Sequence, residues 1–206
     1  MRTYYERRAR EYDDWWLGRG RFAERDRPGW HEEVDELRLA LESLPPARTL
    51  DVACGTGFLT KHLPGEIVGL DQSETMLAEA RRQAPDATFE TGDALVLPFA
   101  DGSYDLVFTA HFYGHLEEAD RLTFLGEARR VASELVVVDS ALRPDVEPAE
   151  VQERMLNDGS RFQVYKRFFV ADELALELGG GEVLHAGSWF VMVRCRYEAW
   201  DSGASL

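Results

Sequence analysis

Cysteine is scarce in this chain of 206 residues, and long hydrophobic runs are missing. The two cysteines, Cys54 and Cys195, lie in separate apolar runs, which argues against a disulfide scaffold and suits the reducing cytoplasm. No apolar run approaches the length of a membrane span, and the N-terminal residues have no hydrophobic signal segment. No cysteine–histidine cluster has the spacing of a zinc site. We therefore expect a cytoplasmic protein with no membrane span and no metal.

Positive charge is also in short supply, because the net charge is −15. A chain this acidic repels phosphate backbones, which argues against nucleic acid as a partner. The first 30 residues differ, with eight arginines against six acids, and a solvated helix face is the simplest interpretation of that excess. With 45% hydrophobic residues the chain is long and apolar enough to fold as one globular domain.

The segment 49–60, TLDVACGTGFLT, joins a short apolar run to a glycine-rich turn. It predicts a buried strand, a tight turn and a short helix, which is the first unit of a nucleotide-binding fold. Gly55 and Gly57 would let the backbone approach a ligand, because a side chain there would keep it away. The dinucleotide fingerprint requires a third glycine, and Thr60 stands in its place.

An acid, Asp51, lies inside this predicted strand, four positions before Gly55. The stretch resembles motif I of the class I S-adenosylmethionine-dependent methyltransferases, [D/E]-x-G-x-G-x-G, with Ala53 at the first glycine place. The sequence PFADGSYD at 98–105 is similar to a motif of the group that resembles the ubiquinone and menaquinone biosynthesis methyltransferases. The resemblance covers residues 48–140, and it implies S-adenosylmethionine as cofactor and S-adenosylhomocysteine as product.

Acids also follow the next two predicted strands. Asp71 ends the strand 66–71, where a carboxylate can accept hydrogen bonds from ribose hydroxyls, although Ser73 beside it also reads as a helix N-cap. The resemblance implies that Asp93 accepts from the adenine amino group, whereas a plain Gly-Asp turn is the simpler alternative. The cofactor-binding residues that the resemblance implies are Tyr12, Asp51, Ala53, Gly55, Gly57, Asp71, Gln72, Met76, Asp93, Ala94 and Thr109.

The segment His111–His115 follows the fourth predicted strand at its carboxyl end. In proteins of this resemblance such residues lie near the transferred methyl group, so His111 is predicted to contact the acceptor or to act as a general base. Tyr113 is predicted to orient the acceptor through a hydrogen bond. The alternative for His111 is packing beneath the loop, and for His115 a structural loop-to-helix junction is favoured.

The predicted fold class is α/β, a Rossmann-like doubly wound sheet with five parallel strands and a C-terminal hairpin whose last strand is antiparallel. The strands are expected at 49–53, 66–71, 87–91, 104–109, 134–139, 182–186 and 189–196, and the helices at 3–17, 29–44, 74–83, 118–132, 148–156 and 171–178.

Within a single domain, residues 1–46 are expected to form an N-terminal helical cap, 47–140 the cofactor-binding core, and 141–206 an acceptor-side insertion with the terminal hairpin. Five aromatic side chains in the first 16 residues, Tyr12 among them, suggest that the N-terminal helix is a lid over the cofactor.

The sequence therefore predicts a methyltransferase that acts on a small-molecule acceptor by in-line displacement, as a monomer or homodimer. Two alternatives stay open: an NAD(P)-dependent oxidoreductase, which the missing third glycine disfavours, and a non-catalytic protein that binds S-adenosylmethionine.

Overall fold

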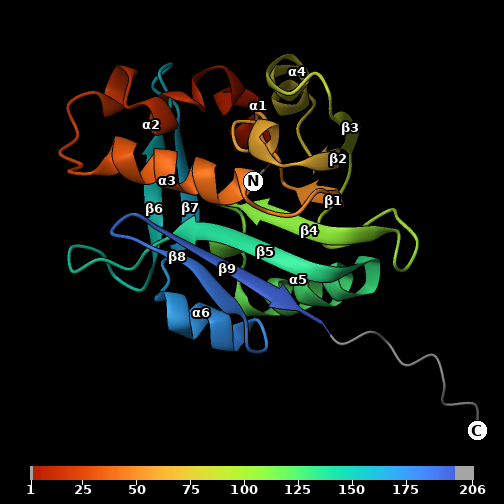
Figure 1. The fold of residues 1–206 in the computed structure, drawn as a ribbon. Coiled ribbons are helices and arrows are strands. Elements are labelled where there is room, and N and C mark those ends of the chain that lie inside the picture. Colours follow the sequence, from red (N-terminus) through yellow and green to blue (C-terminus); the bar gives the residue numbers. More distant parts are fainter. Residues whose placement is uncertain (1, 198–206) are drawn as a thin grey trace, which may run out of the picture.

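A seven-stranded sheet forms the centre of the molecule in the computed structural model, which describes residues 2–197 (Figure 1). The strand order is β3-β2-β1-β4-β5-β9-β8. The first five strands of this order are parallel, and β9 runs antiparallel to both β5 and β8, as predicted. The strands are β1 (Ala47–Val52), β2 (Gly65–Asp71), β3 (Thr88–Thr91), β4 (Tyr104–Ala110), β5 (Ala132–Ser140), β8 (Glu182–Ala186) and β9 (Phe190–Arg196).

Alternation along the central strands divides the hydrophobic core between the two faces of the sheet. In β5, Leu135 and Val137 belong to one buried cluster, and Val136 and Val138 belong to the other. Strands that are buried on both faces read as continuous apolar runs, which explains why the sequence identified them. Helix α3 (Trp30–Glu42) packs on one face, and α5 (Glu118–Val131) and α6 (Ala171–Glu177) pack on the other (Figure 1).

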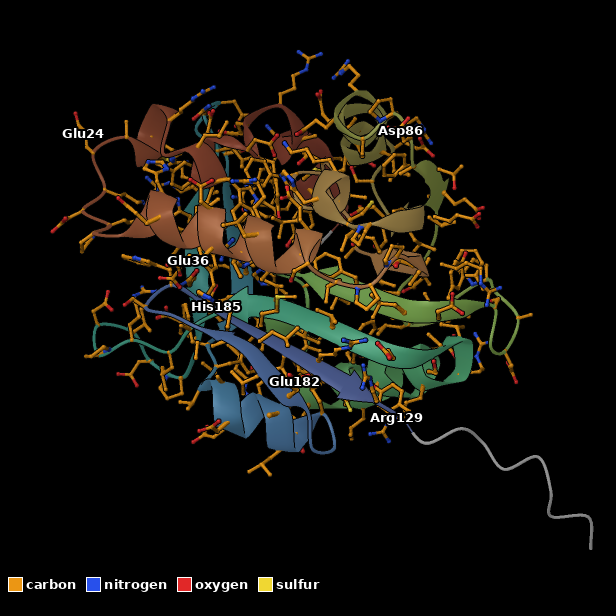
Figure 2. The ribbon with its side chains drawn as sticks, in the orientation of Figure 1. Glu24, Glu36, Asp86, Arg129, Glu182 and His185 are labelled. Atoms are coloured by element: carbon orange, nitrogen blue, oxygen red, sulfur yellow. The ribbon has the colours of Figure 1, made fainter. Side chains whose placement is uncertain are left out.

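A buried carboxylate ties α3 to the terminal hairpin. Glu33 is only 7% exposed and accepts the backbone N–H groups of Ser188, Trp189 and Phe190. Nε2 of His185 lies 3.2 Å from the Glu33 carboxylate, and Glu36 lies on the other side of the His185 ring (Figure 2). These bonds place the hairpin against the N-terminal part of the chain.

The segment 148–156 was expected to be helical, and this prediction is wrong. The strand β6 (Ala149–Met155) pairs with the antiparallel strand β7 (Arg161–Arg167) in a separate two-stranded sheet. Exposed and partly buried residues alternate along β6, which is the period of a strand and not of a helix. The hairpin lies outside the main core, so its strand β6 is mostly polar. The alternation between exposed and partly buried positions is therefore hard to recognise from the sequence.

The N-terminal helix is divided where one continuous helix was predicted. Helix α1 (Arg2–Arg8) continues into a 3₁₀ turn (Ala9–Glu11), and α2 (Asp14–Leu17) follows. Tyr4 packs with Leu156 and Val164 of the β6–β7 hairpin, so the segment lies beside that hairpin (Figure 1). The short helix expected after the glycine turn is likewise only a 3₁₀ turn, Thr60–His62. Helix α4 (Glu74–Gln83) begins as predicted, with Oγ of Ser73 accepting from the N–H of Met76.

Candidate active site

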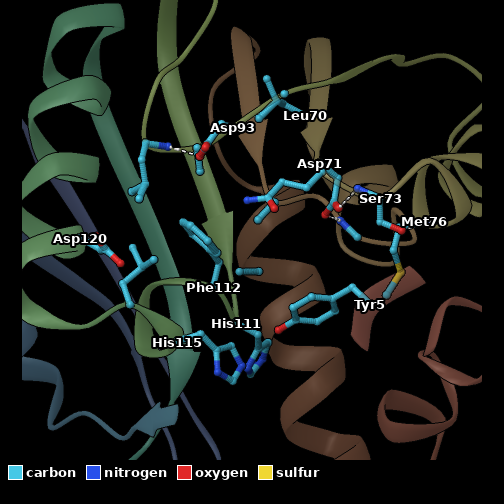
Figure 3. Close-up of a pocket in the computed structure, with 18 of the residues that line it drawn as sticks. Tyr5, Leu70, Asp71, Ser73, Met76, Asp93, His111, Phe112, His115 and Asp120 are labelled. Carbon is cyan, nitrogen blue, oxygen red and sulfur yellow. Dashed lines mark hydrogen bonds between the residues drawn. The ribbon is translucent and has the colours of Figure 1, made fainter. Parts of the chain in front are cut away.

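A cavity lies at the carboxyl ends of β1, β2 and β4, beneath the N-terminal segment (Figure 3). Ligands of open α/β sheets bind at this edge. Asp71 and Asp93 lie toward one end of the cavity and His111 and His115 toward the other. The residues that line it are Tyr5, Tyr12, Ala53, Gly55, Leu70, Asp71, Gln72, Ser73, Met76, Gly92, Asp93, Ala94, Leu95, Ala110, His111, Phe112, His115, Leu116 and Asp120.

Asp71 is fixed at the end of β2 by backbone donors. Its two carboxylate oxygens accept the N–H of Gly55 at 3.0 Å and the N–H of Ser73 at 2.9 Å. Each oxygen has a second lone pair, so the carboxylate can still accept from a ligand. Burial raises the pKa of Asp71, while these backbone hydrogen bonds oppose the rise. The geometry fits the predicted role toward a pair of hydroxyls.

The glycine turn presents bare backbone to the cavity. Gly55 has a φ of 57°, and a Cβ on it would point toward the Tyr12 ring, 3.8 Å away. Ala53, which replaces the first motif glycine, also has a positive φ of 59°. That conformation costs a non-glycine residue about 1–2 kcal/mol, which explains why glycine is usual at this place. Gly57 does not line the cavity: it allows close packing, because a Cβ there would lie 3.1 Å from Ala80 of α4.

Asp51 faces a smaller adjoining cavity, which shares Tyr12, Ala53 and Ala110 with the main one. It is 2% exposed, and its carboxylate accepts the hydroxyl of Thr60 at 2.6 Å. Burial raises its pKa to about 7, with the Thr60 hydrogen bond acting in the opposite direction. A buried carboxyl that lacks a cation partner among residues 2–197 is suited to a ligand that brings one.

Small and apolar residues form the walls near Asp93. Oδ1 of Asp93 accepts the N–H of Leu95 at 2.9 Å, which closes a tight turn after β3. Ala94 and Phe112 line the cavity beside it. An apolar wall with one carboxylate at its edge suits a heterocycle that carries an amino group. Met76, which is fully buried, and Gln72 line the cavity near Asp71.

His111 lies at the opposite end in a strained conformation. It has a φ of 52° and is 8% exposed, and its Nδ1 lies 3.5 Å from Oγ of Ser140. Its Nε2 is buried and has no hydrogen-bond partner within the described chain. Burial lowers the pKa of His111 to about 3, so the ring is neutral at pH 7 and is a weak base. Strain and an unpaired buried nitrogen are typical of functional positions.

A buried ion pair holds the loop that carries both histidines. Asp139 at the end of β5 pairs with Lys166 of β7 and accepts the N–H of Gly114 at 2.7 Å. Nδ1 of His115 donates to the backbone carbonyl of Tyr165 at 2.6 Å. Because His115 is committed to this bond, it fits the structural role that the sequence favoured, although its ring also lines the cavity.

Besides Asp51 and Gly57, two further predicted site residues lie outside the cavity. Tyr113 is fully buried in the core and donates its hydroxyl to Glu177 at 2.8 Å, so it does not fit the role of orienting an acceptor. The hydroxyl of Thr109, also fully buried, donates to the carbonyl of Val52 at 2.8 Å and links β4 to β1. Sequence spacing placed both near the strand end but could not tell which way their side chains point.

Sequence reasoning missed other residues of the cavity. Tyr5 was identified only as part of an aromatic helix face, yet its hydroxyl points toward His111 (Figure 3). Asp120 of α5 also lines the cavity, and nothing in its sequence context distinguishes it from other acids in the first turn of a helix. The aromatic crowding of the first 16 residues was the only signal for Tyr5.

Comparison with known proteins finds methyltransferases. A family model described as a methyltransferase domain matches residues 49–134. The DhpI–SAH complex has a TM-score of 0.71 and 28% identity, and the likeness covers 96% of this chain and 95% of that one. The fold and the matched domain resemble those of the class I S-adenosylmethionine-dependent methyltransferases.

The curated relatives match a smaller part of this chain. Demethylmenaquinone methyltransferase of Thermotoga maritima is 39% identical over 107 residues, which is 50% of this chain and 44% of that protein. The enzyme of the same name from Thermus thermophilus is 45% identical over 102 residues, which is 45% of each chain. The central part of this chain thus resembles the menaquinone biosynthesis enzymes, and the match spans less than half the length of these relatives.

Proposed function

We propose that this protein is a methyltransferase that uses S-adenosylmethionine to methylate a small-molecule acceptor by in-line displacement. The observation that carries the proposal is Asp71, held by backbone donors of the glycine turn and of Ser73 at the edge of the cavity. The DhpI relative, which matches over almost the full chain, was solved in complexes named with SAH and with SAM. No helix within residues 2–197 is long and apolar enough to cross a membrane.

The residues of the cavity fit the parts of this cofactor. Asp71 suits the ribose hydroxyls, and Asp93 with Ala94 suits the adenine. Asp51, whose pKa is raised by burial, suits the ammonium of the methionine part. Bound cofactor supplies an activated methyl group with its own leaving group. The chain's contribution is therefore to hold two reactants in line, which can be worth about 7–11 kcal/mol.

His111 is our candidate for contact with the acceptor. It is a cavity residue with an unpaired buried nitrogen, and as a neutral ring it can accept or donate a hydrogen bond. Its low pKa makes it more suitable for orienting an acceptor than for removing a proton that is tightly held.

Two other functions give different results in the same assays. An NAD(P)-dependent oxidoreductase would bind NAD and not S-adenosylhomocysteine. A non-catalytic binding protein would bind S-adenosylhomocysteine yet transfer no labelled methyl group to any acceptor of a broad panel.

The direct test is calorimetry with S-adenosylhomocysteine and with NAD. We expect S-adenosylhomocysteine to bind and NAD not to bind. Asp71→Ala should weaken binding by about 2–3 kcal/mol, because the ribose hydroxyls lose a charged acceptor. Asp86→Ala, at an exposed turn after α4, is the matched control and should bind like the wild type (Figure 2). Unchanged affinity in Asp71→Ala would reject the ribose assignment.

A further inference from the structure

A second cavity lies between the N-terminal segment and the β6–β7 hairpin, and its charge is unlike that of the molecule. The chain carries a net charge of −15, yet six arginines line this cavity, and five of them have no carboxylate partner among the described residues: Arg8, Arg21, Arg25, Arg27 and Arg154. Three come from the loop after α2, one from α1 and one from β6. Segments that are far apart in the sequence therefore bring like charges together at one place, which is costly unless an anion is bound there.

None of the five guanidinium groups pairs with a carboxylate within residues 2–197. Arg8 is 7% exposed, and it donates to the hydroxyl of Tyr4 at 2.6 Å and lies over the ring of Tyr12. Arg27 donates to the carbonyl of Trp15, and Arg154 donates to the side-chain carbonyl of Gln152. Burial lowers the pKa of Arg25, and the charges of Arg21, Arg154 and Arg8 lower it further.

The acids at this cavity are already engaged. Glu11 accepts the backbone N–H of Asn157 at 3.0 Å, and Glu153 pairs with Arg161 of β7. Glu150 accepts from the side-chain amide of Gln152 at 2.7 Å. The other cations of the wall, Lys166 and Arg143, pair with Asp139 and Asp145. Glu11 and Glu150 keep their negative charges because their donors are neutral. The five arginines therefore exceed the unpaired carboxylates of this cavity by three within the described chain.

His111 separates this basic cavity from the cofactor cavity. Its ring lines the cofactor cavity, and it packs edge-on against Trp15 at 4.8 Å and lies beside Ser140. Trp15 and Ser140 both line the basic cavity. Burial lowers the pKa of His111, Asp139 opposes this shift, and the charges of Lys166, Arg154 and Arg8 lower it further. A small molecule anchored among the arginines can thus reach the end of the cofactor cavity.

We propose that the basic cavity binds an oxyanion group, such as a carboxylate or a phosphate, of the methyl acceptor. The substrate class is then a small anionic molecule whose charged group anchors it in line with the cofactor. Planar guanidinium groups match the paired oxygens of such anions. This inference rests on the proposed function, because it assigns the acceptor side of the same site.

Inorganic phosphate is the probe, added to protein saturated with S-adenosylhomocysteine so that the cofactor cavity is filled. Trp15 and Trp30 line the basic cavity, so their fluorescence reports binding. We expect a saturable change with wild-type protein and at least tenfold weaker binding in Arg25→Gln/Arg154→Gln, which removes two charges. Both positions are partly or fully exposed, and thermal unfolding checks that the variant folds.

Arg10→Gln is the matched control, since Arg10 is exposed in the same N-terminal segment and does not line the cavity. It should bind phosphate like the wild type. No saturable phosphate signal, or an equal loss in Arg10→Gln, overturns the inference. The same samples separate the two proposals: protein that binds S-adenosylhomocysteine but not phosphate refutes only the anion site, and protein that binds neither refutes the proposed function.

Discussion

At the scale of single residues, the site contains titratable groups whose charged forms are disfavoured by burial. Burial raises the pKa of Asp51 to about 7 and lowers that of His111 to about 3. Both residues lie around the same strand ends, and perturbed groups that gather in a cavity are typical of functional sites. Such groups reduce the stability of the fold, which makes their effects measurable without an acceptor.

Asp51 should make stability depend on pH. The folded protein holds its proton more tightly than the unfolded chain, whose pKa is near 3.8, so the free energy of unfolding falls as pH rises from about 4 to about 7. Asp51→Asn keeps an acceptor for the Thr60 hydroxyl and removes this pH-dependent contribution to the free energy of unfolding. Urea unfolding should show the wild type losing roughly 2–3 kcal/mol more than Asp51→Asn between pH 5 and 8. Parallel pH curves, like those expected for exposed Asp86→Asn, would contradict the buried assignment.

His111→Ala should lower turnover far more than cofactor affinity. If the ring handles a proton of the acceptor, the loss is about 10²–10⁴-fold. Because the pKa is about 3, protonation of this ring should produce no acidic limb in the rate between pH 5 and 8. Turnover and S-adenosylhomocysteine affinity are measured on the same variant. Turnover within a few-fold of wild type, or a loss that only follows cofactor affinity, would remove His111 from the reaction.

At the scale of elements, the parts that the sequence predicted well are those with a strong apolar period. Strands β1, β2, β4 and β5 read as apolar runs because both of their faces are buried. Strand β6 was missed because it is polar and buries little, and its alternation was too weak to outweigh a helical interpretation, whereas the extended segment expected at 163–169 agrees with β7. The direction of a side chain at a strand end, as for Tyr113, depends on tertiary packing that no spacing rule contains.

The N-terminal segment is expected to respond to cofactor. Tyr5 and Tyr12 line the cavity, and the backbone carbonyl of Glu6 accepts the hydroxyl of Thr75 in α4, so the segment closes over the site. Hydrogen exchange of residues 2–12 should slow when S-adenosylhomocysteine binds. Helix α6, on the other face of the sheet, provides the comparison peptide. Equal exchange of residues 2–12 with and without ligand would indicate a plain structural helix.

Trp16 limits how much of this segment can act as a lid. It is 3% exposed and stacks on Phe58 and Phe190, so it belongs to the core and not to a movable cap. A truncation that tests the lid should therefore end before residue 13, because the Asp13 carboxylate accepts hydrogen bonds from the side chains of Thr56 and Gln83. The sequence showed the aromatic crowding but could not divide it between core and cavity.

At the scale of the whole molecule, the carboxyl ends of the parallel strands lie along one edge of the sheet. The N-terminal segment and the β6–β7 hairpin lie next to this edge. Asp71 and Asp93 were predictable because each acid follows a strand within a recognisable motif. The arginine cluster was not, since its members come from α1, the loop after α2 and β6, which only the fold brings together. The excess of arginine in the first 30 residues, interpreted from sequence as a solvated face, contributes four of them.

The structure of the protein crystallised with S-adenosylhomocysteine tests the central claim most directly. The ligand should lie in the cavity of Figure 3, with its ribose hydroxyls on the Asp71 carboxylate, its adenine beside Asp93 and its sulfur toward His111. A ligand bound elsewhere, or one whose ribose does not contact Asp71, would contradict the account.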